Sequence, residues 1–587
     1  MKRQSARATK EEVMKVCWKR RSWMTNCVLV STCALIAATT TGCNGDTAEK
    51  TRTANGITAN DLATYTRELS DDSLKGRGTG GEGQGATLEY LRAAYERIGL
   101  APVGDSAPGE TSAGEGQFFQ EVELVGITAD PDTAALSFAG SKAAEALELR
   151  YGPDFVTWTP EPEEEFEIGG DLVFVGYGVD APEERWNDFD GLDVKGKILL
   201  VLVNDPPLED QSRFGGEAMT YYGRWTYKIE EAARQGAAGV LLIHETEAAG
   251  YGWNVAYSSF IGELMWAPEL SVLPPLTPLQ GWISRDATDQ ILRSAGLNIN
   301  ELASAAARDG FKPVDLGLTV SAHLDNSTRT VASYNVVGAI EGADPAVADE
   351  YIIYMAHWDH FGVGEPVDGD AIYNGALDNA TGTAGMLEVA EAWAATEPPP
   401  RRSALFVATT AEEWGFFGTV TYIENPITPL EKTLAVINID GLNVWGPTED
   451  MMIIGMGKST LDDDLTEVLM EQGRTPIPDP EPEKGYYFRA DHFPFALAGI
   501  PALYAPCGMS YVNEPEGFYE QVWGEYEANH YHQPSDEFDP SWDFSGAAQD
   551  MEALLQVGLR VSAADTWPEW RPDSEFKAAR DAMMQIQ

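Results

Sequence analysis

The stretch EYIIYMAHWD, at residues 350–359, joins an aliphatic run to a histidine and an aspartate at its end. A short apolar run bounded by polar residues is typical of a buried strand. Two runs of the same kind follow, SALFVATT at 403–410 and LAVINID at 434–440, and helical spacing at 379–395 lies between the first two strands. Aliphatic strands alternating with helices predict an α/β fold whose mostly parallel, mixed sheet is flanked by helices.

Acidic and imidazole side chains stand where these three strands end. The first strand ends in His357-Trp358-Asp359, the second is followed by Glu412-Glu413, and the third ends in Asp440. Ligands of such sheets collect at the carboxyl ends of the strands. We therefore expect these side chains to meet at one edge of the sheet.

The residue types suit a metal centre with a general base. His357 and Asp359 are two apart in an extended segment, so Asp359 could accept a hydrogen bond from the His357 nitrogen that does not bind metal. The adjacent carboxylates of Glu412 and Glu413 repel each other unless a cation compensates. The natural division of roles makes Glu413 a metal ligand and Glu412 the general base.

Further candidates lie outside the strand ends. Asp378, in GALDNATG at 375–382, precedes a helix and could either cap it or bridge two cations. Asp440 ends an apolar strand, where a carboxylate has to be paired or solvated.

The segment YHQPSD, at residues 531–536, supplies a second imidazole. We expect His532 to complete a second metal sphere, Tyr531 to donate a hydrogen bond to an oxyanion, and Asp536 to support the local loop. The histidines at 244, 323, 360 and 530 are interpreted as structural or surface residues. RADHFP, at 489–494, is a candidate for the substrate wall, with packing as the alternative.

Taken in order, the motifs AHWDH, GALDNATG, ATTAEEWG, INIDG, ADHFPFALAGIPAL and YHQPSD resemble the co-catalytic dizinc exopeptidase family (clan MH). That family includes bacterial leucyl aminopeptidases, glutamate carboxypeptidases and glutaminyl cyclases. The resemblance covers roughly residues 60–130 and 330–565. It implies two zinc ions, with manganese or cobalt as alternatives, bridged by one carboxylate. The implied metal ligands are His357, Asp378, Glu413, Asp440 and His532, with Asp378 as the bridge.

The resemblance also implies an activity. Glu412 would be the base that takes a proton from a water shared by the two metals, with Asp359 supporting a ligand and Tyr531 as oxyanion donor. We expect an aminopeptidase acting on peptide substrates. A carboxypeptidase on the same scaffold, a glutaminyl cyclase and an inactive binding protein are the alternatives.

The region between residues 60–130 and 330–565 has a different sequence pattern. DLVFVGYGV (171–179), DVKGKILLVLV (193–203) and AARQGAAGVLLI (232–243) resemble the protease-associated domain, an insert found in several exopeptidases. The expected organisation is a peptidase domain at 60–139, an insert at 140–312, and the rest of the peptidase domain at 313–587.

The amino-terminal region predicts export. Residues 1–42 combine a basic stretch with an apolar run at 28–38 that is too short to span a bilayer comfortably, as in a signal peptide. Gly42 before Cys43 resembles a lipoprotein cleavage box, although Thr40 departs from its usual large aliphatic residue. We expect a periplasmic or outer-membrane lipoprotein acylated at Cys43, with a polar tether at 43–59. An ordinary secretory signal is the alternative.

The composition of the chain limits the kinds of partner that it is expected to bind. The chain has 40 basic and 93 acidic residues, a net charge of −53, which argues strongly against binding nucleic acid. Beyond the signal and Cys43 only Cys507 remains, so an intrachain disulfide framework is not expected. Membrane contact is expected only through a lipid anchor.

Overall fold

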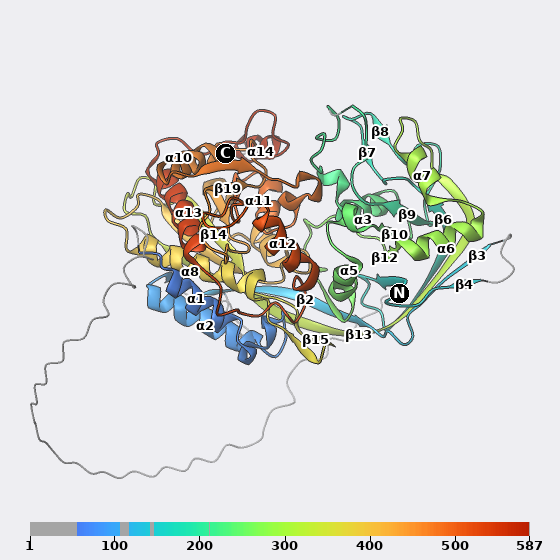
Figure 1. Ribbon diagram of the computed structural model, residues 1–587, viewed down its shortest axis with the longest axis horizontal. Coiled ribbons are helices and arrows are strands. Elements are labelled where there is room, and N and C mark those ends of the chain that lie inside the picture. The colour runs from blue at the N-terminus through green and yellow to red at the C-terminus, as the bar shows by residue number, and fades with distance from the viewer. Residues whose placement is uncertain (1–55, 106–116, 141–145, 211, 586–587) are drawn as a thin grey trace, which may run out of the picture. The chain divides into compact units, whose positions relative to one another are not determined.

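The computed structural model describes residues 56–105, 117–140, 146–210 and 212–585. Strands β14 (Tyr351–His357), β17 (Ser403–Thr409), β18 (Thr433–Asn438) and β21 (Ala502–Tyr504) pair in parallel, in the order β21-β18-β14-β17 (Figure 1). The predicted α/β fold is confirmed. The predicted signal peptide and Cys43 lie outside the described residues.

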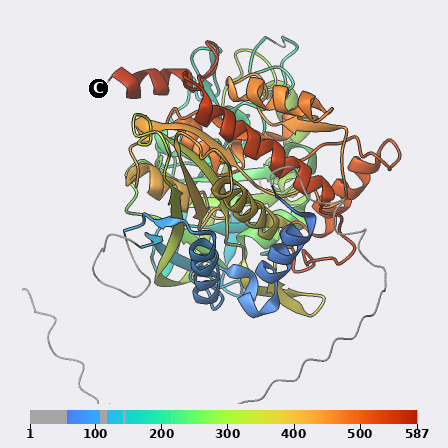
Figure 2. The same ribbon diagram turned by 90° about the vertical axis from the view of Figure 1, so that its left-hand side faces the viewer.

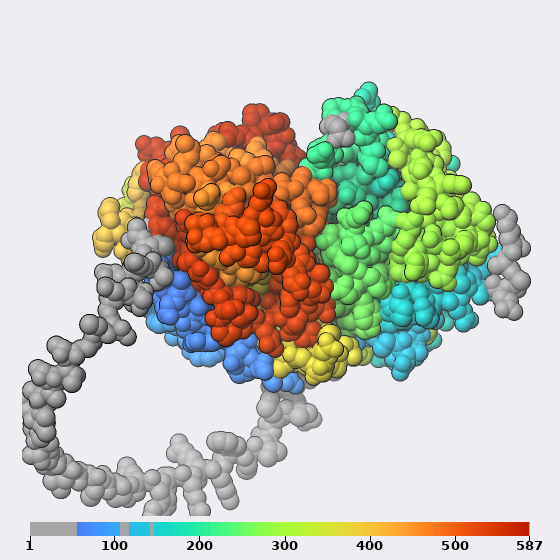
Figure 3. Space-filling model, in the orientation of Figure 1, coloured from blue at the N-terminus to red at the C-terminus, as the bar shows by residue number. Residues whose placement is uncertain are grey.

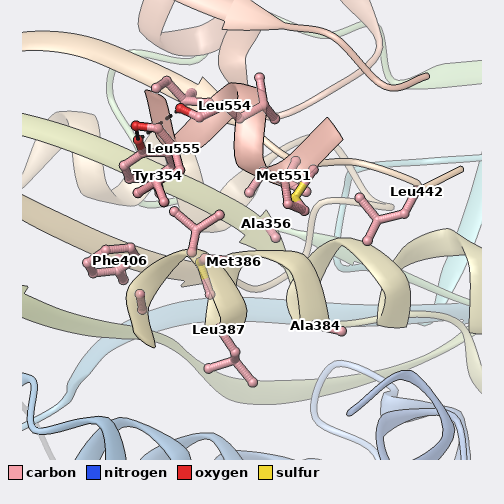
Figure 4. Packing of buried hydrophobic residues seen from close by; sticks show 14 of the residues in the cluster. Tyr354, Ala356, Ala384, Met386, Leu387, Phe406, Leu442, Met551, Leu554 and Leu555 are labelled. Carbon is pink, nitrogen blue, oxygen red and sulfur yellow. Dashed lines mark hydrogen bonds between the residues drawn. The ribbon is translucent and has the colours of Figure 1, made fainter. Parts of the chain in front are cut away.

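Helices cover one face of these strands. α8 (Thr381–Ala394) and α13 (Ser545–Ala563) contact β14 and each other, and α1 (Ala59–Leu69) packs on both helices (Figure 2). Their shared core includes Tyr354, whose hydroxyl donates a hydrogen bond of 3.0 Å to the carbonyl of Leu554 (Figure 4). Burial of these apolar side chains holds the carboxyl ends of the strands in fixed positions.

Strand β13 (Val314–Ile340) connects two parts of the molecule through 27 residues. Its second half pairs antiparallel with β17 and β2 (Phe119–Ala129), and its first half with β3 (Ala135–Gly140) and β6 (Glu165–Phe174). The apolar stretch at 331–340 is thus the end of a much longer strand. In Figure 1, β13 and β2 run side by side between the two groups of helices.

The region predicted to be an insert, residues 140–312, is called the insert below and contains a second set of parallel strands: β9 (Ile198–Leu202), β10 (Gly239–His244) and β12 (Leu279–Ser284). α3 (Trp225–Arg234) and α6 (Arg285–Ala295) contact β10, and the buried side chains of one apolar cluster here range from Leu136 to Leu324. Within the motif at 171–179 the strand β6 ends at Phe174, because the chain turns at Gly176 and Gly178, both of which have positive φ.

Two short elements tie the insert to the rest of the fold. β11 (Glu263–Trp266) pairs antiparallel with β2, and α5 (Trp253–Phe260) precedes it directly. In the space-filling view the green surface of the insert adjoins the orange and red carboxy-terminal segments (Figure 3). Among the described helices, none combines the length and hydrophobicity that crossing a membrane requires.

Candidate metal centre

His357 is the last residue of β14 and is 2% exposed. Its Nε2 atom lies 3.2 Å from Oδ1 of Asp378 and 3.4 Å from Oδ1 of Asp440. Its Nδ1 atom lies 3.1 Å from the main-chain carbonyl oxygen of Asp359. Nδ1 is thus hydrogen-bonded while Nε2 faces two carboxylates, which is the orientation that metal ligation requires.

The expectation that the Asp359 carboxylate holds this imidazole is wrong. The strand ends at His357, and the chain beyond it turns so that the Asp359 carbonyl reaches Nδ1. The carboxylate instead accepts hydrogen bonds from the Thr79 hydroxyl (3.1 Å) and the Glu412 amide (3.3 Å). Asp359 therefore supports both the ligand and the expected base, by a different route.

Asp378 lies between the two imidazoles. Its Oδ1 atom faces His357, and its Oδ2 atom lies 3.4 Å from Nε2 of His532. The segment Ala376–Ala380 is not regular helix, with φ −111 and ψ 92 at Asp378, and α8 begins only at Thr381. Asp378 therefore does not cap the helix, and each of its oxygens is directed at a separate histidine.

The two adjacent glutamates follow β17 and separate after Ala411, which has a φ of 55°. Oε2 of Glu413 lies 3.2 Å from Nε2 of His532. Glu412 instead lies on the other side, with a carboxylate oxygen within 4.8 Å of the ligand atoms of His357 and Asp440. Glu412 and Glu413 therefore face different halves of the site.

Tyr531 and His532 enter from the carboxy-terminal part of the chain. Their rings stack with centroids 3.8 Å apart, and Phe361 contacts the His532 ring edge-on at 4.7 Å. Nδ1 of His532 lies 2.9 Å from Oγ of Ser259, a residue of α5 in the insert. The structure thus brings together the predicted metal ligands and Glu412, with the Tyr531 ring beside them.

Several buried supports were not identified from the sequence. His360 is 0% exposed, and its Nδ1 lies 2.5 Å from Oε1 of Glu413. Arg77, 1% exposed, donates hydrogen bonds to the carbonyls of Trp358, Leu69, Asn374 and Gly375. The AHWDH motif contains His360, but nothing in the sequence pairs Arg77 with a loop some three hundred residues away.

The structure corrects two predictions about residues near the site, Asp536 and the segment RADHFP. The Asp536 carboxylate accepts hydrogen bonds from the amides of Leu377 (2.9 Å) and Asp378 (3.1 Å), so it supports the bridging segment rather than its own loop. Within RADHFP, Asp491 is buried and accepts hydrogen bonds from the hydroxyls of Thr409 and Thr419. This part of the expected substrate wall is packed inside the protein.

The electrostatics show an excess of negative charge. Burial raises the pKa of Glu412 well above its ordinary value, and the Glu413 carboxylate adds to the effect. Burial would lower the pKa of His532, but the carboxylates of Glu413 and Asp378 outweigh it and raise that pKa to about 9. Carboxylates crowded in this way need compensating cations.

The donor set fits zinc. It consists of imidazole nitrogens and carboxylate oxygens, and Nε2 of His532 is buried without a hydrogen-bond partner. Ligands that bind one zinc tetrahedrally at 2.0–2.2 Å are about 3.4 Å apart. The four separations between an imidazole nitrogen and a carboxylate oxygen in the candidate centre, 3.2–3.4 Å, match this spacing.

A mostly parallel α/β sheet whose strand ends carry this donor set is the arrangement expected from the sequence motifs. The family model described as Peptidase family M28 matches residues 335–555 of this chain. The resemblance seen in the sequence motifs is confirmed.

Curated relatives match about half of this chain. Aminopeptidase NAALADL1 of Mus musculus is 32% identical over 319 residues, which are 46% of this chain and 38% of that protein. A glutamate carboxypeptidase 2 homolog of Caenorhabditis elegans is 26% identical over 316 residues, 46% of this chain and 37% of that one. The chain therefore spans well under half the length of either relative.

Among solved structures, an aminopeptidase from Aneurinibacillus sp. strain AM-1 has a similar fold. The TM-score is 0.50 at 17% sequence identity, over 88% of this chain and 95% of the other. At this identity the similarity establishes the fold alone.

Proposed function

We propose that this protein is a metal-dependent aminopeptidase that removes N-terminal residues from peptides at a centre of two zinc ions. The observation that carries the proposal is the placement of Asp378, whose two oxygens face Nε2 of His357 and Nε2 of His532 separately. Asp440 completes the His357 side and Glu413 the His532 side. Manganese or cobalt would suit the same donors.

Zinc ions in such a site supply a water activated for attack near neutral pH and polarise the scissile carbonyl. Glu412 accepts a proton from the attacking water and returns it to the leaving amine. Its carboxylate lies beside His357 and Asp440, within the same candidate metal centre. Tyr531, stacked on His532, is placed to donate a hydrogen bond to the oxyanion.

A carboxypeptidase is the second candidate, because the structure contains a cationic pair beside the site. Arg224 is 7% exposed, and its pKa is lowered to about 9 by burial and by the neighbouring charge of Arg489. Both arginines are close enough to interact electrostatically with Tyr531. Within the described part of the chain neither guanidinium forms an ion pair. Such a pair would suit a substrate carboxylate.

Matched peptide panels test the proposal. The zinc-loaded protein is incubated with peptides that have free N-termini and with the same peptides acetylated. Release of single residues from the front of the free set alone is the expected result. Release of single residues from the carboxyl end of both sets would establish the carboxypeptidase instead. A double change, Arg224→Gln with Arg489→Gln, should then abolish that second activity selectively.

A glutaminyl cyclase and an inactive binding protein would behave differently in the same assay. The cyclase would cyclise N-terminal glutamine without releasing residues, and the binding protein would neither bind zinc nor cleave. The presence of every donor and of Glu412 in one site supports an active hydrolase.

We further propose that the protein is exported and carries a lipid anchor at Cys43. Both proposals rest on the amino-terminal sequence, in which a basic stretch and a short apolar run precede Gly42 and Cys43. Cell fractionation of the full chain tests both, because an anchored protein is recovered with the membranes and an unanchored exported protein is not.

A further inference from the structure

Two consecutive serines of the insert contact two consecutive residues of the candidate metal centre. Oγ of Ser259, on α5, lies 2.9 Å from Nδ1 of His532. Oγ of the preceding Ser258 accepts a hydrogen bond of 3.1 Å from Nε2 of Gln533. Helix α5 therefore contacts the metal-ligand segment at two consecutive side chains rather than at one.

The contact at Nδ1 has a chemical consequence. A neutral imidazole that binds a metal through Nε2 carries its proton on Nδ1, and an acceptor at Nδ1 fixes that tautomer and the ring orientation. His357 finds this acceptor in its own segment, the carbonyl of Asp359 at 3.1 Å. For His532 the partner of Nδ1 is the hydroxyl of Ser259, which is far away in sequence and is able to accept this proton.

His532 has particular need of this support. It lies outside any helix or strand, with a φ of 57°, in a region that side chains other than glycine adopt at a cost. Tyr531 stacks on one face of the ring and Phe361 contacts it edge-on. These ring contacts restrict the orientation of the imidazole, and the hydrogen bond to Ser259 holds its Nδ1 atom in place.

Helix α5 is itself fixed at both ends. The indole of Trp253 donates a hydrogen bond of 2.9 Å to the carbonyl of Gly152, and Phe260 stacks on Trp158 at 4.1 Å. Beyond the helix, β11 pairs with β2, which in turn pairs with β13. The serine is therefore presented by a framework that is anchored in both the insert and the sheet carrying the other ligands.

We propose that Ser259 is a positioning residue through which the insert sets the zinc affinity of the His532 half of the centre. The hydroxyl accepts the Nδ1 proton of His532 in a hydrogen bond and leaves Nε2 free to bind metal beside Asp378 and Glu413. The inference rests on the proposed two-zinc centre and adds to it a role for the insert. It predicts that the two zinc affinities respond differently to the loss of one hydroxyl.

The test compares Ser259→Ala with wild type by titrating zinc into the metal-free full chain against a chromophoric chelator. Loss of an outer hydrogen-bond partner typically weakens metal affinity about 10–100-fold. We expect a change of this size in one of two zinc constants, with the other unchanged. Ser259→Thr, which keeps the hydroxyl, should bind both ions as wild type does. Ser294→Ala is the matched control, since its hydroxyl bonds only Ile291 of its own helix.

Further readouts separate positioning from a loss of structure. The thermal midpoint of metal-free Ser259→Ala should equal that of the Ser294→Ala control. Unchanged zinc constants, or equal weakening of both ions together with a lowered metal-free midpoint, would overturn the role of Ser259. Failure of the wild type to bind two zinc ions would be a different result, because it overturns the proposed function itself.

Discussion

His360 and Glu413 form a buried pair, with Nδ1 of the imidazole 2.5 Å from Oε1 of the carboxylate. The other oxygen of Glu413 lies 3.2 Å from Nε2 of His532. The Glu413 carboxylate thus lies between two imidazoles. His360 supports it, and His532 would bind the same metal ion. The orientation of Glu413 is therefore decided by a residue that does not itself belong to the donor set.

Replacing His360 by Phe should weaken zinc binding while the chain stays folded. The change preserves a ring of similar size but removes the partner of Glu413, and losses of this type cost about 10–100-fold in metal affinity or activity. Zinc content after dialysis against a weak chelator measures the effect. His244→Phe, at a buried position of β10 where the imidazole packs against the rings of Trp253 and Trp282, is the control. Equal zinc retention in the two variants would show that Glu413 needs no support.

Replacing Glu412 by Gln should abolish turnover and leave the metal in place. The amide has nearly the same shape but cannot accept the proton, and general acid–base groups contribute about 100-fold to 10,000-fold to rate. The rate constant at saturating peptide and the zinc content of the same preparation are measured together. Turnover within a factor of a few of wild type would remove Glu412 from its proposed role. Joint loss of zinc and activity would reassign it as a ligand.

Replacing Arg77 by Ala should destabilise the protein strongly. The guanidinium donates to four main-chain carbonyls around the metal centre, at distances of 2.6–2.8 Å. Leaving even one buried acceptor unsatisfied costs about 1–3 kcal/mol, so the total should exceed about 3 kcal/mol. Urea denaturation measures the change, with the exposed Arg67→Ala as control. A midpoint as high as that of the control would refute this role.

Glu388 should make stability depend on pH. Burial raises the pKa of this carboxyl to about 8, and its Oε2 atom accepts a hydrogen bond from the Thr58 amide. Because the folded-state pKa is raised, the folded protein favours the protonated form. Stability is therefore lost as pH rises from about 4.5, the unfolded value, toward 8.

Glu388→Gln should consequently unfold at a higher temperature than wild type at pH 8 and at the same temperature at pH 4. The amide keeps the acceptor for Thr58 without a charge to bury. Each unit of pKa difference corresponds to about 1.4 kcal/mol, so a gain of at least about 1 kcal/mol is expected at pH 8. Thermal midpoints at both pH values, with the exposed Glu148→Gln as control, provide the check. A difference that does not change with pH would contradict the argument.

The parallel strands that carry the candidate metal centre can be predicted from the sequence, because each one is marked by a local run of apolar residues. Strands 351–357, 403–409 and 433–438 are largely apolar runs, and a site residue either ends the strand or follows it within a few positions. A run of this kind must be buried, so the polar residue after it marks the edge of the sheet. The 27-residue length of β13 is harder to predict, because four consecutive exposed residues at 327–330 separate its alternating first half from its buried last residues.

The sequence by itself placed His357, Glu413 and Asp440 at one edge of the sheet, since each ends or follows a buried parallel strand, and the family resemblance added Asp378 and His532. Only the tertiary structure decided which atoms face each other. It placed the Asp359 carbonyl rather than its carboxylate at His357, His360 at Glu413, and Ser259 at His532. These contacts depend on where turns direct each side chain and on how segments far apart in sequence pack. The hydrogen bonds have lengths of 2.5–3.1 Å and involve single residues, so they produce no periodic pattern in the sequence from which they could be predicted.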